Sequence, residues 1–129
     1  MAGRYLLDTS TIIPLFRGET GITDRIVQAR AIFIPVIALG ELHYGARRSV
    51  RVEWNLERLD QFARDFDVLE CDATTARHFG SIKGQLKSRG RPIPDNDIWI
   101  AALGRQHRLV IASRDRHFGS IEVLHVQTW

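Results

Sequence analysis

The sequence predicts an α/β fold in three layers, with a short and mostly parallel sheet between two layers of helices. Short apolar runs alternate with longer segments of helical periodicity. This alternation is typical of parallel sheets, because each helix carries the chain back across the sheet. With 129 residues, 44% hydrophobic and 26% charged, the chain has the composition of a globular protein, and we expect one domain over residues 1–129.

Composition also bears on where the protein acts. No apolar run reaches the roughly 20 residues that a membrane-spanning helix needs, and the N-terminal residues lack the pattern of a signal peptide. We therefore expect a cytoplasmic protein. A single cysteine, Cys71, forms no internal disulfide bond and no cysteine zinc site, and we expect it to be a small core residue.

The chain begins with an apolar strand at residues 4–7, followed by the acid Asp8. A helix is expected directly after it and ends at Gly18, since glycine readily adopts the left-handed conformation of a helix C-terminus. A second, short helix follows over residues 20–30. In open α/β sheets ligands bind at the carboxyl ends of strands, which makes Asp8 a candidate site residue; capping the first helix is the simpler alternative.

The next part of the chain predicts one strand and two helices. The strand is the apolar run at residues 31–36. The helix over 36–49 is apolar on most sides and carries one acid, Glu41, with no basic residue four positions later. The helix over 52–66 is amphipathic, and we expect Trp54 on its buried face.

The second half of the chain continues the alternation. Strands are expected at residues 67–71 and 109–113, with a terminal edge strand at 121–126. A helix over residues 72–88 lies between the first two of these strands, and another follows the segment PIPDND at 92–97.

Two aspartates open this last helix. Pro94 forces an extended approach, so we expect Asp95 to cap the helix by accepting a free backbone amide hydrogen. Asp97 has no such role. A charge in the first turn gains only about 0.3 to 1 kcal/mol from the helix dipole, which is small against the cost of burying a carboxylate. We therefore expect a cationic partner close to Asp97.

Four acids share the lack of a visible structural role. Two follow buried strands, one lies in an apolar helix and one begins another: Asp8, Asp115, Glu41 and Asp97. Carboxylates that meet in one cleft repel each other, so they need raised pKa values or bound cations. Oxygen ligands select Mg²⁺ or Mn²⁺, ions that can activate water for attack on a phosphodiester. The four acids thus indicate a metal-dependent nuclease.

The remaining charge is strongly basic. The net charge is +3, and without the four acids 18 basic residues face 11 acids, a net charge of +7. Residues 73–94 contain basic residues and no acid, and their position before the two aspartates favours substrate contact, although a solvated helix face explains part of the pattern. The candidate nucleic-acid contacts are Lys83, Lys87, Arg89 and Arg91, with Arg114 beside Asp115.

Four motifs carry a family resemblance. LLDTS at residues 6–10, GEL at 40–42, DIWIAA at 97–102 and ASRDRHF at 112–118 resemble the motifs of PIN-domain ribonucleases, and the short chain resembles the VapC-type toxins of bacterial toxin–antitoxin pairs. The resemblance spans essentially the whole chain. It implies an Mg²⁺- or Mn²⁺-dependent endoribonuclease, the toxin of a type II system, that cleaves selected RNA, forms a homodimer and is neutralised by a protein antitoxin.

The resemblance also implies roles for individual residues. It assigns metal binding and catalysis to Asp8, Glu41, Asp97 and Asp115. It leaves Asp95 with two roles, an added metal contact or a helix cap alone. Ser10 and Ser113 match small hydroxyl positions that orient a ligand carboxylate or a metal-bound water.

Other interpretations remain open from the sequence. One is a noncatalytic RNA- or antitoxin-binding module of the same fold, which the four intact acids disfavour. Another is a phosphatase with Asp8 as nucleophile, but Ser10 stands where such enzymes usually have a second aspartate. His117 is expected only as the polar end of a strand loop. For the aromatic residues Tyr44 and Trp99, and as a second interpretation for Trp54, a dimer or antitoxin interface is the alternative to core packing.

Overall fold

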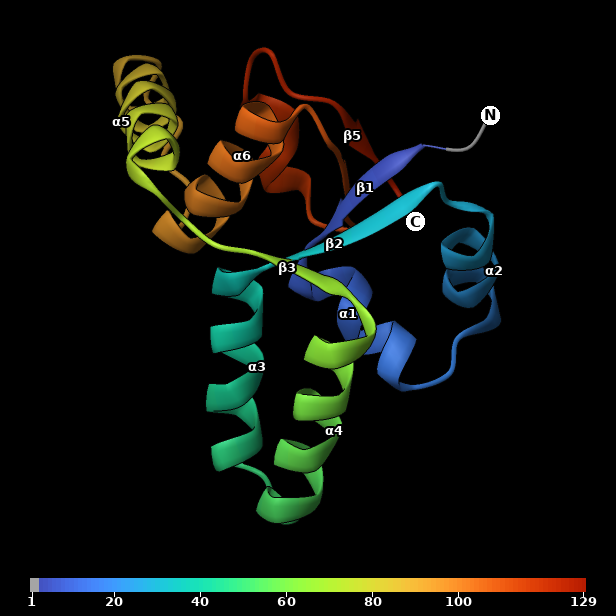
Figure 1. The fold of residues 1–129 in the computed structure, drawn as a ribbon. Coiled ribbons are helices and arrows are strands. Elements are labelled where there is room, and N and C mark those ends of the chain that lie inside the picture. Colours follow the sequence, from blue (N-terminus) through green and yellow to red (C-terminus); the bar gives the residue numbers. More distant parts are fainter. Residues whose placement is uncertain (1–2) are drawn as a thin grey trace.

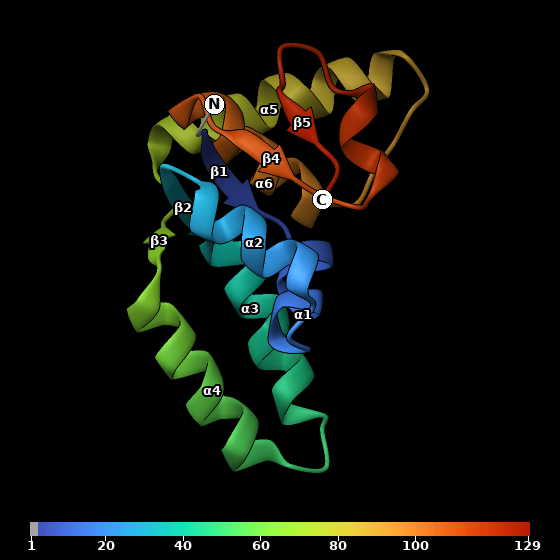
Figure 2. The same cartoon turned by 90° about the vertical axis from the view of Figure 1, so that its right-hand side faces the viewer.

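The computed structural model describes residues 3–129 and contains one sheet with helices on both sides (Figures 1 and 2). Its elements, in chain order, are β1 (Arg4–Leu7), α1 (Thr9–Phe16), α2 (Thr20–Gln28), β2 (Ala31–Pro35), α3 (Val36–Arg47), α4 (Val52–Asp65), β3 (Asp67–Leu69), α5 (Ala73–Ser88), α6 (Asp95–His107), β4 (Val110–Ala112), the 3₁₀ helix η1 (Arg116–Ser120) and β5 (Val126–Gln127).

The sheet is parallel and has the strand order β3-β2-β1-β4-β5. The central strand β1 pairs with β2 on one side and with β4 on the other, so that Leu6 lies between Phe33 and Ile111. The chain leaves β1 in one direction and later returns on its other side. Ligands of open α/β sheets bind where the strand order reverses in this way, at the carboxyl ends of the strands. In this chain that point lies between β1 and β4.

The helices form two outer layers. Helices α5 and α6 pack together on one side of the sheet, and α2 lies on the opposite side, while α3 and α4 form a pair that projects away from the strands (Figures 1 and 2). This arrangement confirms the predicted three-layer α/β fold. No helix within residues 3–129 combines the length and the apolar character that a membrane crossing requires.

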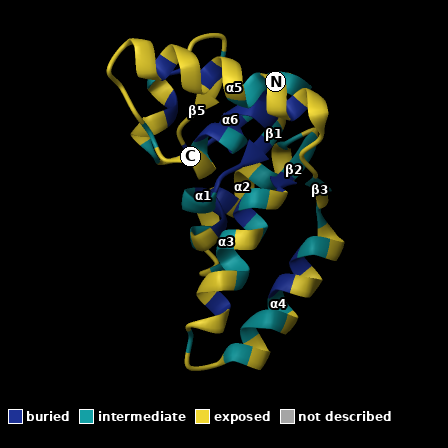
Figure 3. Cartoon of the chain, turned by 90° about the vertical axis from the view of Figure 1, so that its left-hand side faces the viewer, coloured by how far each residue is buried: buried dark blue, intermediate teal, exposed yellow. Residues whose placement is uncertain are grey.

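The core is built around β1 and α6, as the burial colours in Figure 3 show. The run from Ile98 to Gly104 in α6 is buried at every position but Trp99, which stacks on Phe79 with 4.1 Å between ring centroids. The predicted burial of this helix is therefore confirmed. Because α6 is held on most sides, its first turn is held as well, and that turn carries Asp97.

The expected terminal strand over residues 121–126 is wrong, because the observed β5 covers only Val126–Gln127. Residues 116–120 form η1 instead, and Val123 has a positive φ of 55° that is incompatible with an extended strand. Ile121 and Leu124 of this segment turn inward from an irregular loop and pack on the core, whereas Val123 is 81% exposed.

Three expected core residues lie on the surface, and one of them, Tyr44, is 65% exposed. Cys71 is exposed because the edge strand β3 ends two residues earlier, at Leu69. Trp54 is 43% exposed. It lies near the start of α4, before the part of the helix that packs on the core through Phe62. Its ring lies 4.2 Å from the guanidinium carbon of Arg51 and 4.6 Å from that of Arg58, so cations rather than apolar side chains cover it.

The contact between α6 and β4 predicts an asymmetry between two glycines. A Cβ on Gly104 would lie 2.9 Å from Cδ1 of the buried Ile111, whereas one on Gly84 in α5 would meet nothing within 4 Å. Overpacking of this kind costs about 1 to 3 kcal/mol, and an exposed helical Gly→Ala change gains about 0.5 to 1 kcal/mol. We expect urea unfolding to show Gly104→Ala destabilised and Gly84→Ala stabilised; equal effects would contradict the packing.

Candidate active site

Asp8 lies at the carboxyl end of β1 and is only 3% exposed. Ser10 and Ser113 each donate a hydroxyl hydrogen bond of 2.7 Å to one of its two carboxylate oxygens. These hydroxyls in turn accept the backbone N–H groups of Arg114, at 2.8 Å, and Asp115, at 2.9 Å. Burial raises the pKa of Asp8, the two hydroxyls oppose this change, and the charges of Asp115 and Asp97 add to it.

Thr11 fixes the backbone beneath this carboxylate. Its buried hydroxyl lies 2.9 Å from the carbonyl oxygen of Asp8 and 3.1 Å from that of Ala112, which joins the ends of β1 and β4. Together with Ser10 and Ser113, Thr11 makes a polar seam between the two strands. The strand ends therefore have little freedom to move apart.

Glu41 reaches the site from α3. Thr9 donates a hydrogen bond of 3.2 Å to its Oε1, so a hydroxyl of α1 takes the place of the missing basic neighbour. Burial raises the pKa of Glu41, the Thr9 bond opposes the rise, and the negative charges of Asp97 and Asp8 contribute to it. Glu41 therefore lies close enough to both aspartates for their charges to act on it.

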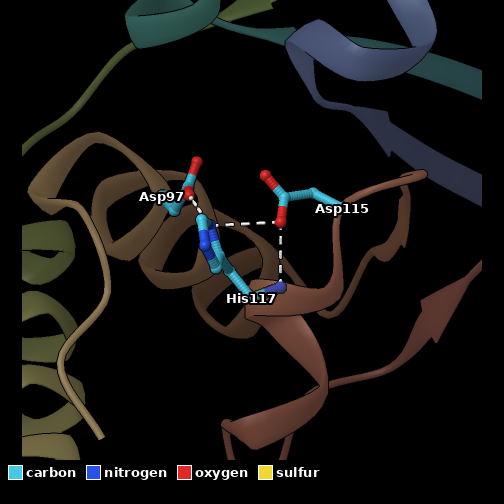
Figure 4. A group of neighbouring side chains, drawn as sticks. All are labelled: Asp97, Asp115 and His117. Carbon is cyan, nitrogen blue, oxygen red and sulfur yellow. Dashed lines mark hydrogen bonds and ion pairs between the residues drawn. The ribbon is translucent and has the colours of Figure 1, made fainter.

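Asp97 and Asp115 meet at His117, as Figure 4 shows. Nδ1 of His117 lies 2.7 Å from Oδ2 of Asp97 and 3.1 Å from Oδ1 of Asp115. The hydrogen bond to Asp97 raises the pKa of His117, with partial burial opposing and the two negative charges adding to the rise. The expectation that His117 is merely the polar end of a loop is wrong, because η1 turns the imidazole back between the acids.

The structure separates the two aspartates of α6. The helix is capped at Pro94, not at Asp95, so the expected cap is wrong: Asp95 is already the first residue of the helix, and no side chain accepts a capping hydrogen bond. The Asp95 side chain is 59% exposed and lies 2.9 Å from Nζ of Lys83. The Asp97 side chain is 17% exposed and faces the other acids.

The site combines acids from four segments with little compensating charge. Within residues 3–129, only His117 forms an ion pair with any of Asp8, Glu41, Asp97 or Asp115. Arg114 points elsewhere, toward Glu19 and the carbonyl oxygen of Trp129. Ligand atoms of Asp97, Asp115 and His117 all lie within 4.8 Å of one another. An uncompensated oxygen-rich cluster of this kind fits a divalent cation.

The basic candidates for RNA contact are mostly engaged by acids. Lys83 pairs with Asp95, Arg89 with Glu122 and Arg114 with Glu19, all at exposed positions. Lys87 and Arg91 are exposed and form no ion pair with another residue of the described chain. Their contact with RNA stays a prediction.

Three residues of the site escaped the sequence analysis: Thr9, Thr11 and His117. The first two belong to the hydroxyl run after Asp8, which signals hydrogen bonding to a strand-end acid. The signal for His117 is its spacing from Asp115. An aspartate that caps a turn by accepting the N–H two residues later, here at 2.9 Å, brings that residue beside its own carboxylate.

Comparisons with known proteins agree with this geometry. The chain matches the PIN domain over residues 5–124. It is 33% identical to ribonuclease VapC2 of Haemophilus influenzae, over 98% of each chain. It is 31% identical to the tRNA(fMet)-specific endonuclease VapC of Shigella flexneri, again over 98% of each chain.

Solved structures give the same result. The DNA-bound VapBC from Salmonella typhimurium contains a chain that aligns with a TM-score of 0.91 and 30% identity, over 100% of this chain and 99% of that one. VapBC-1 from nontypeable Haemophilus influenzae aligns with a TM-score of 0.90 and 29% identity, over 97% of each chain. The protein therefore belongs to the PIN-domain family, among the VapC ribonucleases.

Proposed function

We propose that this protein is a metal-dependent endoribonuclease and the toxin of a type II toxin–antitoxin pair, acting in the cytoplasm as one domain over residues 1–129. One observation carries the proposal: acids from β1, α3, α6 and the end of β4 converge with almost no cationic partner. The relatives named as ribonucleases support the reaction class.

The chain's residues divide the work of hydrolysis. Asp97, Asp115, Asp8 and Glu41 would hold Mg²⁺ or Mn²⁺. When bound, the cation activates water and neutralises charge on the phosphodiester. Ser10 and Ser113 keep the Asp8 carboxylate in a single orientation. Glu41 is more accessible than Asp8, so of these two acids it is the better placed to accept the proton of the attacking water.

Substrate and partner follow from the relatives. The Shigella and Salmonella relatives are named as specific for tRNA(fMet), so a structured RNA of the tRNA class is the substrate we propose. The VapBC structures from Salmonella and Haemophilus support a protein antitoxin as partner, and we retain the homodimer as part of the proposal. An aspartyl phosphatase is disfavoured, because Ser10 stands where such enzymes usually have a second aspartate.

The first test removes one acid at constant shape. Asp97→Asn should lower the rate of tRNA cleavage in Mn²⁺ or Mg²⁺ more than about 100-fold, since even the outer partners of a metal ligand are worth 10- to 100-fold. Asp24→Asn is the matched control, because Asp24 is an exposed acid of α2. Gel analysis of a tRNA transcript measures the rate, and circular dichroism checks the fold. Cleavage by Asp97→Asn at the parent rate would sink the assignment.

The second test uses the pKa of Asp8. The pKa of Asp8 is higher in the folded protein than in the unfolded chain, where it is about 4. Ionisation of Asp8 therefore lowers the free energy of unfolding as the pH rises from about 4 through the pKa of the folded state. Without metal, Asp8→Asn should therefore melt at a higher temperature than the parent at pH 7, and the difference should shrink toward pH 4. Thermal melts in EDTA measure this. A parent that melts higher at pH 7 would contradict the prediction.

A further inference from the structure

We propose that His117 is a ligand of the divalent cation and makes the site prefer Mn²⁺ over Mg²⁺. This inference rests on the proposed function, because it assumes that the acidic cluster binds a metal. It goes further by adding a nitrogen donor to a set of carboxylates. It also assigns to one side chain the choice between two ions.

The spacing of the donor atoms fits one coordination shell. Neighbouring ligands of an octahedral ion, each about 2.1 Å from the metal, lie about 3 Å from one another. Nδ1 of His117 lies 2.7 Å from Oδ2 of Asp97 and 3.1 Å from Oδ1 of Asp115. Nδ1 of His117 is thus spaced from each aspartate oxygen like an adjacent donor of one coordination shell, and all three residues offer donor atoms within 4.8 Å of one another. In Figure 4 the imidazole lies between the two carboxylates.

The backbone of His117 is held so that its imidazole faces Asp97 and Asp115. The backbone N–H of His117 donates to Oδ1 of Asp115 at 2.9 Å, and Ser120 Oγ donates to the carbonyl oxygen of His117 at 3.2 Å. The next residue, Phe118, is fully buried and anchors η1 in the core. The His117 side chain itself is 44% exposed, so an ion can reach its ring from solvent.

The two ions differ in the donor atoms that they accept. Mg²⁺ is bound almost entirely by oxygen, whereas imidazole nitrogen suits first-row transition ions. A cluster of carboxylates alone would accept either ion. An imidazole in the same shell favours Mn²⁺. If His117 only held Asp97 in place by a hydrogen bond, its removal would weaken both ions alike.

The experiment detects the nitrogen directly. Pulsed electron paramagnetic resonance of the Mn²⁺-loaded protein should show hyperfine coupling to a directly bound nitrogen, and ¹⁵N-histidine labelling should change that coupling. His117→Asn should lose the signal, while His125→Asn, an exposed histidine before β5, should keep it. Calorimetric titrations should show the ratio of Mn²⁺ to Mg²⁺ affinity falling about tenfold in His117→Asn and staying unchanged in His125→Asn.

The outcomes separate the two proposals. Mn²⁺ that binds without nitrogen coupling in the parent protein overturns the role of His117 and leaves the nuclease proposal standing. An unchanged affinity ratio in His117→Asn also overturns it. Failure of the parent to bind Mn²⁺ at all contradicts both proposals.

Discussion

The burial of Asp8 at the end of the central strand is the constraint on which the rest of the site depends. A carboxylate with 3% exposure is costly unless its oxygens are satisfied. Hydroxyls satisfy both, and Ser113 reaches Asp8 only because the chain beyond β4 passes directly over the end of β1. That same passage delivers Asp115 and then turns into η1, which returns His117 to the acids. The polar bonds that make Asp8 tolerable therefore also assemble its neighbours.

Hydrophobic packing provides the other half of this arrangement. Helix α6 is buried from Ile98 to Gly104 except at Trp99, so its first turn is fixed against the sheet although Asp97 itself is polar. Gly104 allows α6 to approach Ile111 of β4 closely. The distance between Asp97 and the acids at the strand ends is thus set by apolar contacts far along the helix. Packing of the core holds the acids together against their electrostatic repulsion. Their combined negative charge can therefore attract a cation.

The sequence was sufficient for the parallel sheet, because each strand and helix carries its own periodicity, and for bringing Asp8 and Asp115 together, because strand ends of a parallel sheet meet. Glu41 and Asp97 lie on helices, and the roles of all four acids stay predictions. It failed where tertiary contacts override a local rule. Asp95 has the sequence context of a cap, yet Pro94 takes that position and Lys83 takes the carboxylate. Trp54 follows the apolar period of α4, but it lies near the start of the helix, away from the buried residues Leu59 and Phe62. His117 was missed because its partners are 20 and 2 residues away, and only the turn of η1 brings both together.

The ion pairs of the basic residues are compatible with the RNA contacts that we propose for them. Lys83, Arg89 and Arg114 pair with acids whose side chains are at least 45% exposed, and solvent-screened pairs of this kind contribute little to stability. A phosphate is a stronger partner for arginine than an exposed carboxylate, because it carries more acceptor oxygens and releases counterions when neutralised. The RNA contacts that we propose would therefore replace these surface acids at small cost. Asp8 differs from them, because buried hydrogen bonds hold both of its oxygens in place.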